Sequence, residues 1–397
     1  MKNDNVIILG DPHLGKSMSI GKAAIGSGLN SRLNDQINLL NWVTDQAEIH
    51  SVRNIIITGD VFEEPKPHPS LIVALLSWIT KCKYENITLH FVMGNHDMFR
   101  TGNIYTSALD ILYSSEIENV HVYNDPTTLY IDNFAYTLIP FRDRKSLNVA
   151  SNIEAVSVIQ RIVDYELASI PINYKKVVVG HLAIEGSIFV GDEVDDIQNE
   201  LFCPIKMFTG YDYVWMGHVH KPQVLNKNNP YVAHIGSMDL SDFGEVDHKK
   251  RIVLIDHTNN SFSESFLPTR QLAKFNIIVP KNVKNTTDYV VNEINNAKNL
   301  DKSIVKIEVT FESNDLLPLN KKDVEKALYD KGVFNITNIS QIKKANLIKK
   351  DDTVNMSIDI NPISAIKLYA EKHVEEKYKS KFITTCSSIL DRLLEKS

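Results

Sequence analysis

The sequence predicts an α/β fold: a four-layer α/β/β/α sandwich, followed by a small α+β unit and a C-terminal helical segment. Near the start of the chain, short apolar runs alternate with segments of helical periodicity, which is typical of a largely parallel sheet covered by helices. From Asn119 onward, short strands separated by turn residues indicate a second sheet. After Pro268 the strand pattern changes again, which marks a boundary.

The first sheet is predicted from continuous apolar runs that end at glycine. Val6 to Leu9 is such a run, and Gly10 bounds it. Residues 33–47 carry apolar side chains at helical spacing and are expected to return the chain to the next strand. The expected elements are a strand over residues 6–9, a loop over 15–30, a helix over 33–47, a strand over 55–58, a helix over 70–82 and a strand over 88–93.

The rest of the chain completes the sandwich and adds two smaller units. Further strands are expected over residues 120–123, 128–131, 134–139, 176–179, 213–216, 231–235 and 251–255, with a helix over 153–168. An α+β unit follows, with strands over 275–279, 304–311 and 336–342 and helices over 286–297 and 321–330. Residues 362–394 form one helical apolar stripe. We therefore expect three domains, over residues 1–268, 269–350 and 351–397.

The bulk composition is that of a soluble globular protein, with 43% hydrophobic and 23% charged residues. The net charge of −6 means that any nucleic-acid binding must use local patches or a partner. The three cysteines form no CxxC pair, so neither a disulfide framework nor a thiolate zinc site is expected. The chain shows no secretory signal and no apolar run of about 18 residues, which favours a cytoplasmic location.

Five predicted strands each end at a glycine that is followed by aspartate, asparagine or histidine. One such pair alone is most often a turn, but five in one chain are hard to explain by turn chemistry. Strand ends of this kind predict one metal site, and its candidate ligands are Asp11, His13, Asp60, Asn95, His181, His218 and His220.

This donor set suits a pair of divalent ions. Two ions about 3.5–4 Å apart can bind a phosphoester and activate water, and they need a bridging carboxylate with imidazole or amide ligands. The mixture of nitrogen and oxygen donors favours manganese, iron or zinc over calcium. His96 follows Asn95 but leaves the backbone in another direction, so it is expected to act as a proton donor or as a cation facing the phosphate, with Asp97 orienting it. His234 is expected to be structural.

These residues carry a family resemblance. Asp11-Pro12-His13, Gly59-Asp60, Gly94-Asn95-His96-Asp97, Gly180-His181 and Gly217-His218-Val219-His220 resemble the five motifs of the calcineurin-like metallophosphoesterases, across about residues 6–256. Within that superfamily, the Asp-x-His-Leu-Gly opening and residues 59–63 resemble the SbcD family of DNA repair nucleases. Phosphoprotein phosphatases would carry Asp-Arg-Gly where Glu63-Glu64-Pro65 stands. Residues 119–141 look like bacteriophage members of the family.

The resemblance implies a role for each candidate residue. His96 would be the catalytic histidine, assisted by Asp97, and the metal would be manganese. Asp60 would bridge two ions, of which one is held by Asp11, His13 and His220 and the other by Asn95, His181 and His218.

It also implies a function for the later domains. The α+β unit, covering residues 272–345, would be a capping domain that guides DNA, and residues 362–394 would bind an SMC-like ATPase, SbcC. The family further implies a homodimer formed through residues 33–47 and the helix after Asp97. The expected function is a manganese-dependent DNA exonuclease and endonuclease, the nuclease subunit of an SbcCD-like complex in DNA repair and recombination.

Other functions compete with this interpretation. Residues 10–17 match the P-loop pattern G-x-x-x-x-G-K-[ST] directly after a strand, which predicts an ATPase. However, Asp11 would face the phosphates, Pro12 removes a backbone donor, and no convincing helix follows Ser17. A metallophosphoesterase acting on a non-DNA phosphoester also remains open, whereas a non-catalytic scaffold is disfavoured because no ligand position is missing.

Overall fold

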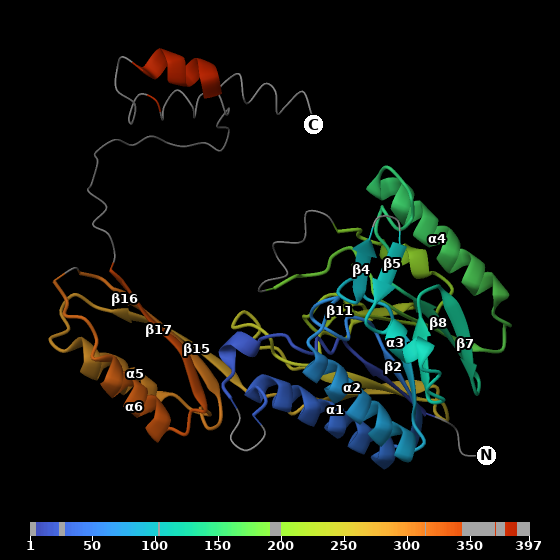
Figure 1. The fold of residues 1–397 in the computed structure, drawn as a ribbon, viewed down its shortest axis with the longest axis horizontal. Coiled ribbons are helices and arrows are strands. Elements are labelled where there is room, and N and C mark those ends of the chain that lie inside the picture. Colours follow the sequence, from blue (N-terminus) through green and yellow to red (C-terminus); the bar gives the residue numbers. More distant parts are fainter. Residues whose placement is uncertain are drawn as a thin grey trace. The chain divides into compact units, whose positions relative to one another are not determined.

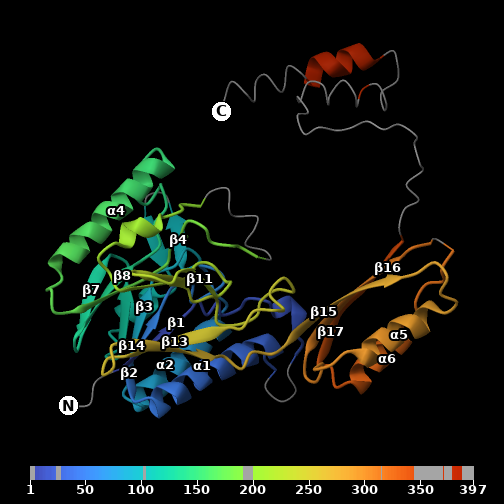
Figure 2. The ribbon, with the colours of Figure 1, turned by 180° about the vertical axis from the view of Figure 1, so that it is seen from behind.

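The computed structural model describes residues 5–23, 28–101, 104–190, 200–313, 315–343, 370 and 378–386. The chain divides into two compact units, residues 1–344 and 345–397. The first unit contains two six-stranded sheets with their covering helices and a separate three-stranded sheet (Figures 1 and 2).

The first sheet has the strand order β14-β13-β1-β2-β3-β6. Its parallel strands are β1 (Asn5–Leu9), β2 (Val52–Ile57), β3 (Thr88–Val92) and β6 (Val120–Tyr123). The antiparallel strands β13 (Arg251–Asp256) and β14 (Ser261–Phe266) extend it beyond β1. The predicted strands of this sheet therefore form, and a polar edge strand, β14, joins them.

The second sheet has the order β11-β12-β10-β9-β8-β7. Its four central strands are parallel: β8 (Phe134–Ile139), β9 (Lys175–Gly180), β10 (Tyr213–Met216) and β12 (Tyr231–His234). The edges are antiparallel: β7 (Thr127–Ile131) and β11 (Gln223–Asn226). The short strand β11 was not predicted.

Alternate residues of a buried strand face different layers, which explains the continuous apolar runs. Ile7 and Leu9 of β1 pack in the core beneath the helices, whereas Val6 and Ile8 pack in the core between the two sheets with Trp215 of β10. Because both faces of β1 are covered from Val6 to Leu9, all four of these positions are apolar.

Helices cover both outer faces, as Figure 1 shows. The first sheet carries α1 (Ser31–Ile49), α2 (Pro69–Tyr84) and the short α3 (Asp110–Ser114). The second carries α4 (Asn152–Ser169), whose start is fixed by a capping box between Ser151 and Glu154, and a 3-10 turn at Ile205–Phe208. The prediction of a four-layer α/β/β/α sandwich is confirmed. A hairpin of β4 (Met98–Thr101) and β5 (Ile104–Ser107) was not predicted.

The α+β unit has its own hydrophobic core. Its parallel sheet, in the order β15-β16-β17, consists of β15 (Leu272–Val279), β16 (Ile304–Phe311) and β17 (Asn335–Lys343). The helices α5 (Thr286–Asn296) and α6 (Lys321–Asp330) pack against it. Arg270, just before β15, donates two hydrogen bonds to Asp35 of α1, at 2.7 and 2.6 Å, which ties this unit to the sandwich.

Residues 370 and 378–386 are helical, and the other residues of the helix predicted over 362–394 lie outside the described part of the chain. No helix among the described residues has both the length and the apolar character needed to cross a bilayer.

Candidate metal centre

The predicted strand ends of both sheets meet at one edge of the sandwich. Asp11, after β1 of the first sheet, accepts a hydrogen bond of 2.6 Å from the backbone N–H of His218, after β10 of the second. Asn95, after β3, is half-buried. The structure brings all seven candidate ligands into this cluster, and the six buried ones are Asp11, His13, Asp60, His181, His218 and His220.

The backbone at these strand ends shows why glycine precedes the polar residue. A Cβ at Gly94 would collide with the carboxylate of Asp60, and one at Gly217 would collide with that of Asp11. Asp60 and His218 themselves adopt the left-handed region, with φ of 45° and 75°, which is uncommon for residues other than glycine. Such strain concentrates at functional sites, where it aims side chains.

The inward nitrogens of the histidines form two pairs. His13 Nε2 and His220 Nε2 lie 3.0 Å apart, and His181 Nε2 lies 3.3 Å from His218 Nδ1. The Oδ1 atom of Asn95 belongs to the second pair, at 2.9 Å from His181 Nε2 and 3.0 Å from His218 Nδ1.

Asp60 lies between the two pairs. Its Oδ2 atom is 3.1 Å from His181 Nε2 and 3.5 Å from His13 Nε2. Two nitrogens on one ion, each bonded at about 2.0–2.1 Å, stand roughly 3 Å apart at ordinary coordination angles. The observed spacings therefore fit two metal positions that share Asp60, and Asp11, His13 and Asp60 also converge as a possible cation-binding group.

Each of these imidazoles also has an oxygen beside its outer nitrogen. His181 Nδ1 lies 3.0 Å from the carbonyl oxygen of Thr58. Carboxylates take this place for the other three: Glu63 at 2.8 Å from His13 Nδ1, Glu200 at 2.8 Å from His218 Nε2, and Glu245 at 3.6 Å from His220 Nδ1. The Glu63 contact is short without being a well-aligned hydrogen bond.

A carboxylate or carbonyl on the outer nitrogen is the usual partner of a metal-binding histidine, because it fixes the ring and its tautomer. None of the three glutamates was predicted from the sequence to be functional. Glu63 did fall within residues 59–63, which carry the family resemblance, and Glu200 ends an acidic segment before β10.

The electrostatics show a site with an excess of buried negative charge. Burial would raise the pKa values of Asp11 and Asp60, but His181 outweighs it and lowers both. Conversely, burial lowers the pKa of His181, and the two aspartates raise it well above its usual value. In the metal-free chain the two aspartates therefore favour the protonated form of His181, and a metal ion bound through its ring would displace that proton.

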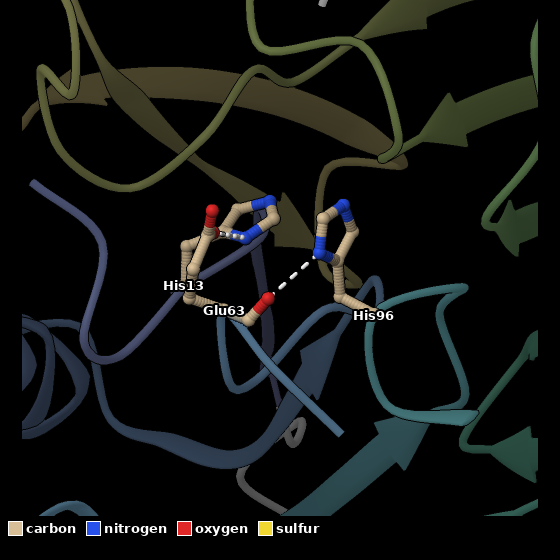
Figure 3. A group of neighbouring side chains, drawn as sticks. All are labelled: His13, Glu63 and His96. Carbon is tan, nitrogen blue, oxygen red and sulfur yellow. Dashed lines mark hydrogen bonds and ion pairs between the residues drawn. The ribbon is translucent and has the colours of Figure 1, made fainter. Parts of the chain in front are cut away.

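His96 is held without using the nitrogen that a substrate could reach. Its Nδ1 lies 2.8 Å from the main-chain carbonyl oxygen of Glu63, and its backbone N–H donates to Asp60 Oδ1 at 2.8 Å (Figure 3). Nδ1 must donate to that carbonyl, so Nε2 remains on the opposite side of the ring. Burial lowers the pKa of His96, but Asp60 and the Glu63 carbonyl raise it above its usual value.

Asp97 was expected to orient the His96 ring, but the structure gives its carboxylate other partners. Its carboxylate accepts hydrogen bonds from the backbone N–H groups of Val61 at 2.9 Å and Gly94 at 3.1 Å. The acceptor that orients the His96 ring is instead the Glu63 carbonyl. Asp97 fastens the loop after β2 to the loop after β3, because the buried backbone donors of both loops converge on it.

The P-loop-like segment does not have the structure that phosphate binding needs. Ser17 is followed by a 3-10 turn, Met18–Ile20, and α1 begins only at Ser31. Lys16 Nζ lies 3.3 Å from the Glu63 carboxylate. His234, which was expected to be structural, is fully buried, and its Nδ1 lies 2.9 Å from the carbonyl oxygen of Gly217, next to His218.

The calcineurin-like phosphoesterase family matches residues 5–222, so the chain belongs to this family of hydrolases. It is 24% identical over 285 residues to the SbcD subunit of the nuclease SbcCD from Staphylococcus saprophyticus, covering 69% of this chain and 71% of that protein. It is 23% identical over 337 residues to the DNA double-strand break repair protein Mre11 of Methanococcus maripaludis, covering 80% and 78%.

A solved structure, a dimetal phosphatase from Danio rerio, is 8% identical, covers 66% of this chain and 96% of its own, and has a TM-score of 0.43. The predicted family resemblance is confirmed by the family match and by the two nuclease and repair relatives.

Proposed function

We propose that this chain is a metal-dependent DNA nuclease, with exonuclease and endonuclease activity, and that it is the nuclease subunit of an SbcCD-like complex in DNA end processing, repair and recombination. The observation that carries the proposal is the convergence of seven inward-facing donors beside His96. The choice of DNA as substrate is supported by the nuclease and repair relatives, which match over most of their own length.

The donors are assigned to two ions that share Asp60. The first is held by Asp11, His13 and His220 and the second by Asn95, His181 and His218. Mixed imidazole and oxygen donors suit manganese. Bound ions would polarise the phosphodiester and supply an activated water at neutral pH.

His96 performs the proton chemistry in this proposal. Its raised pKa favours the protonated ring, and the Glu63 carbonyl holds Nδ1, so Nε2 is the group that faces the phosphodiester. From there it donates a proton to the leaving oxygen, or stabilises the charge that develops on the phosphate. The backbone N–H of His96 donates to Asp60 Oδ1, and this bond keeps the His96 ring at a fixed position beside the proposed bridging ligand.

The proposed partners follow from the relatives. One of them is named as a subunit of SbcCD, which supports an SMC-like ATPase of the SbcC type as partner, and we assign its binding to residues 362–394. We further propose that residues 272–345 guide DNA and that the protein is a homodimer. The net charge of −6 is consistent with DNA binding that depends on local patches or on the partner.

The test is cleavage of linear double-stranded DNA by the purified full chain with manganese. His96→Ala should lose about 10²–10⁴-fold in rate, which is the usual contribution of a general acid or base, while two ions remain bound. His121→Ala, an exposed histidine on β6, is the matched control and should cleave normally. Loss of metal in the His96 variant would contradict its assignment.

A small phosphodiester, bis(p-nitrophenyl) phosphate, separates the nuclease from the alternative phosphoesterase. If the wild-type chain cleaves it but leaves DNA intact, alone and with the ATPase added, the DNA assignment is refuted and the family assignment is kept.

A further inference from the structure

A lysine and a glutamate that the metal assignment does not use lie against the site. The Lys16 side chain is almost fully buried, and its Nζ is 3.3 Å from Glu63 Oε1. The other carboxylate oxygen of Glu63 is 2.8 Å from His13 Nδ1, and its main-chain carbonyl oxygen is 2.8 Å from His96 Nδ1 (Figure 3). Glu63 therefore touches a proposed metal ligand and the proposed catalytic histidine through two different groups.

His13, Glu63 and His96 are close enough to be considered as a third cation site, but their chemistry disfavours it. One donor atom from each residue lies within 4.8 Å of the others, but the two rings contact different oxygens of Glu63, one in the side chain and one in the main chain (Figure 3). The His96 nitrogen that faces a carbonyl must carry a proton. The carboxylate already has Lys16 as a cation beside it. These contacts position side chains.

The two loops that carry these residues are hydrogen-bonded to each other along their backbones. His13 N donates to Asp60 O at 2.9 Å, Leu14 N to Val61 O at 2.8 Å, and Glu63 N to Leu14 O at 3.1 Å. The segments after β1 and β2 therefore form one rigid piece, and the Lys16–Glu63 ion pair links them a second time through side chains.

We propose that Lys16 and Glu63 form a positioning clamp, in which the carboxylate holds His13 with Nε2 toward the first metal position and the carbonyl holds His96 with Nε2 toward the substrate. A neutral imidazole with its proton on Nδ1 has its lone pair on Nε2, which is the form that His13 needs as a metal ligand. For His96, a proton fixed on Nδ1 leaves Nε2 as the nitrogen that gains and releases the catalytic proton. The roles of the two histidines rest on the proposed function. The clamp also accounts for the P-loop-like Gly15-Lys16-Ser17: its lysine binds a carboxylate of the same chain.

The first test is metal binding to the full chain, measured by calorimetry with Mn²⁺ alone. Glu63→Ala should weaken one of the two sites by about 10–100-fold, which is the usual effect of removing the partner of a metal-bound histidine, and leave the other unchanged. Lys16→Met should weaken the same site by a smaller factor, because the carboxylate remains. Glu64→Gln, at the exposed neighbouring glutamate, is the matched control and should bind both ions as the wild type does.

Unchanged affinity of both sites in Glu63→Ala would overturn the clamp, as would an equal loss at both. If that variant does not fold, Glu63→Met, which has a similar side-chain volume and offers no oxygen to His13 Nδ1, is judged by the same criterion.

The second test addresses His96 directly. Two-bond ¹H–¹⁵N spectra of the Zn²⁺-loaded, histidine-labelled chain should show His96 protonated at Nδ1, with the signal assigned by its loss in His96→Ala. A neutral His96 protonated only at Nε2 would overturn this half of the proposal. Neither readout requires DNA cleavage, so failure of the nuclease assay with both results intact would refute the proposed function and leave the clamp standing.

Discussion

The buried ion pair behind His220 yields a prediction with a defined magnitude. The Lys250 side chain is fully buried, and its Nζ donates to the carbonyl oxygen of His220 at 2.8 Å and to Ser237 Oγ at 2.7 Å. Its Nζ also lies 3.3 Å from Glu245, whose other carboxylate oxygen faces the His220 ring. Lys250→Met removes the cation and leaves a buried carboxylate without its counter-charge.

Breaking a buried pair by removing one partner costs about 3–5 kcal/mol, because the remaining charge stays desolvated. Urea unfolding with EDTA present isolates this cost from metal binding, and the free energy of unfolding should fall by about that amount. The double variant Glu245→Gln/Lys250→Met removes both charges and should lose less than Lys250→Met alone.

The same substitution predicts a pH dependence. Burial would raise the pKa of Glu245, but Lys250 and His220 outweigh it and hold the pKa well below its usual value. In the wild type this stabilisation is present above the unfolded pKa, about 4.3, and is lost as the pH falls through the folded pKa. Without Lys250 burial prevails and the folded pKa rises, so the gap in stability between wild type and variant should widen as the pH increases from about 4.3.

A loss of under about 1 kcal/mol at pH 7 would refute this reasoning, since it would mean that the Glu245 carboxylate is solvated in the variant or is already protonated in the wild type. A double variant as unstable as the single one would refute it too. That result would locate the cost in the lost hydrogen bonds to His220 and Ser237.

Two further predictions concern the metal site. Asp60→Asn should remove both ions, because Asp60 Oδ2 lies within 3.5 Å of a histidine nitrogen in each pair, and elemental analysis that still finds two ions would contradict the shared ligand. Burial lowers the pKa of His181, but Asp60 and Asp11 raise it well above its usual value, so metal affinity should increase with pH as the ring loses its proton. Calorimetry in buffers of different ionisation enthalpy should detect the released proton, and an affinity independent of pH would argue against it.

The sequence predicted the buried strands because they are apolar on both faces, and it missed elements that are exposed. β14 (Ser261–Phe266) alternates serine with phenylalanine or glutamate, and β11 (Gln223–Asn226) has only four residues, so neither shows a continuous apolar run. Both are edge strands that are defined by pairing with β13 (Arg251–Asp256) or β12 (Tyr231–His234). Their existence depends on tertiary contacts, which local periodicity does not contain.

The residues of the candidate site also divide into those that the sequence predicted and those that it missed. The inward-facing residues are predictable because a glycine at the end of a buried strand followed by a polar residue is a local pattern. The outer partners are not, because Glu200 meets His218 and Glu245 meets His220 only after the loops fold back. A lone glutamate in a loop is usually solvated, so its sequence neighbourhood carries no sign of the histidine it will contact. The role expected for Asp97 failed for a related reason: adjacency to His96 in sequence did not make it the partner of that ring.

The buried charges around the site explain why two cations, and not one, suit this arrangement. Among the described residues, six carboxylates of the site stand against two lysines: Asp11, Asp60, Asp97, Glu63, Glu200 and Glu245, with Lys16 and Lys250. With all of them ionised, four negative charges remain, and a charge buried without a partner is costly. The metal-free chain offsets part of this excess with protons, because the pKa of His181 is raised, and burial together with Asp60 raises the pKa of Asp97 to about 7. One divalent ion would leave half of the excess in place. Two ions balance it, and binding them should therefore stabilise the folded chain by mass action as well as supply its chemistry.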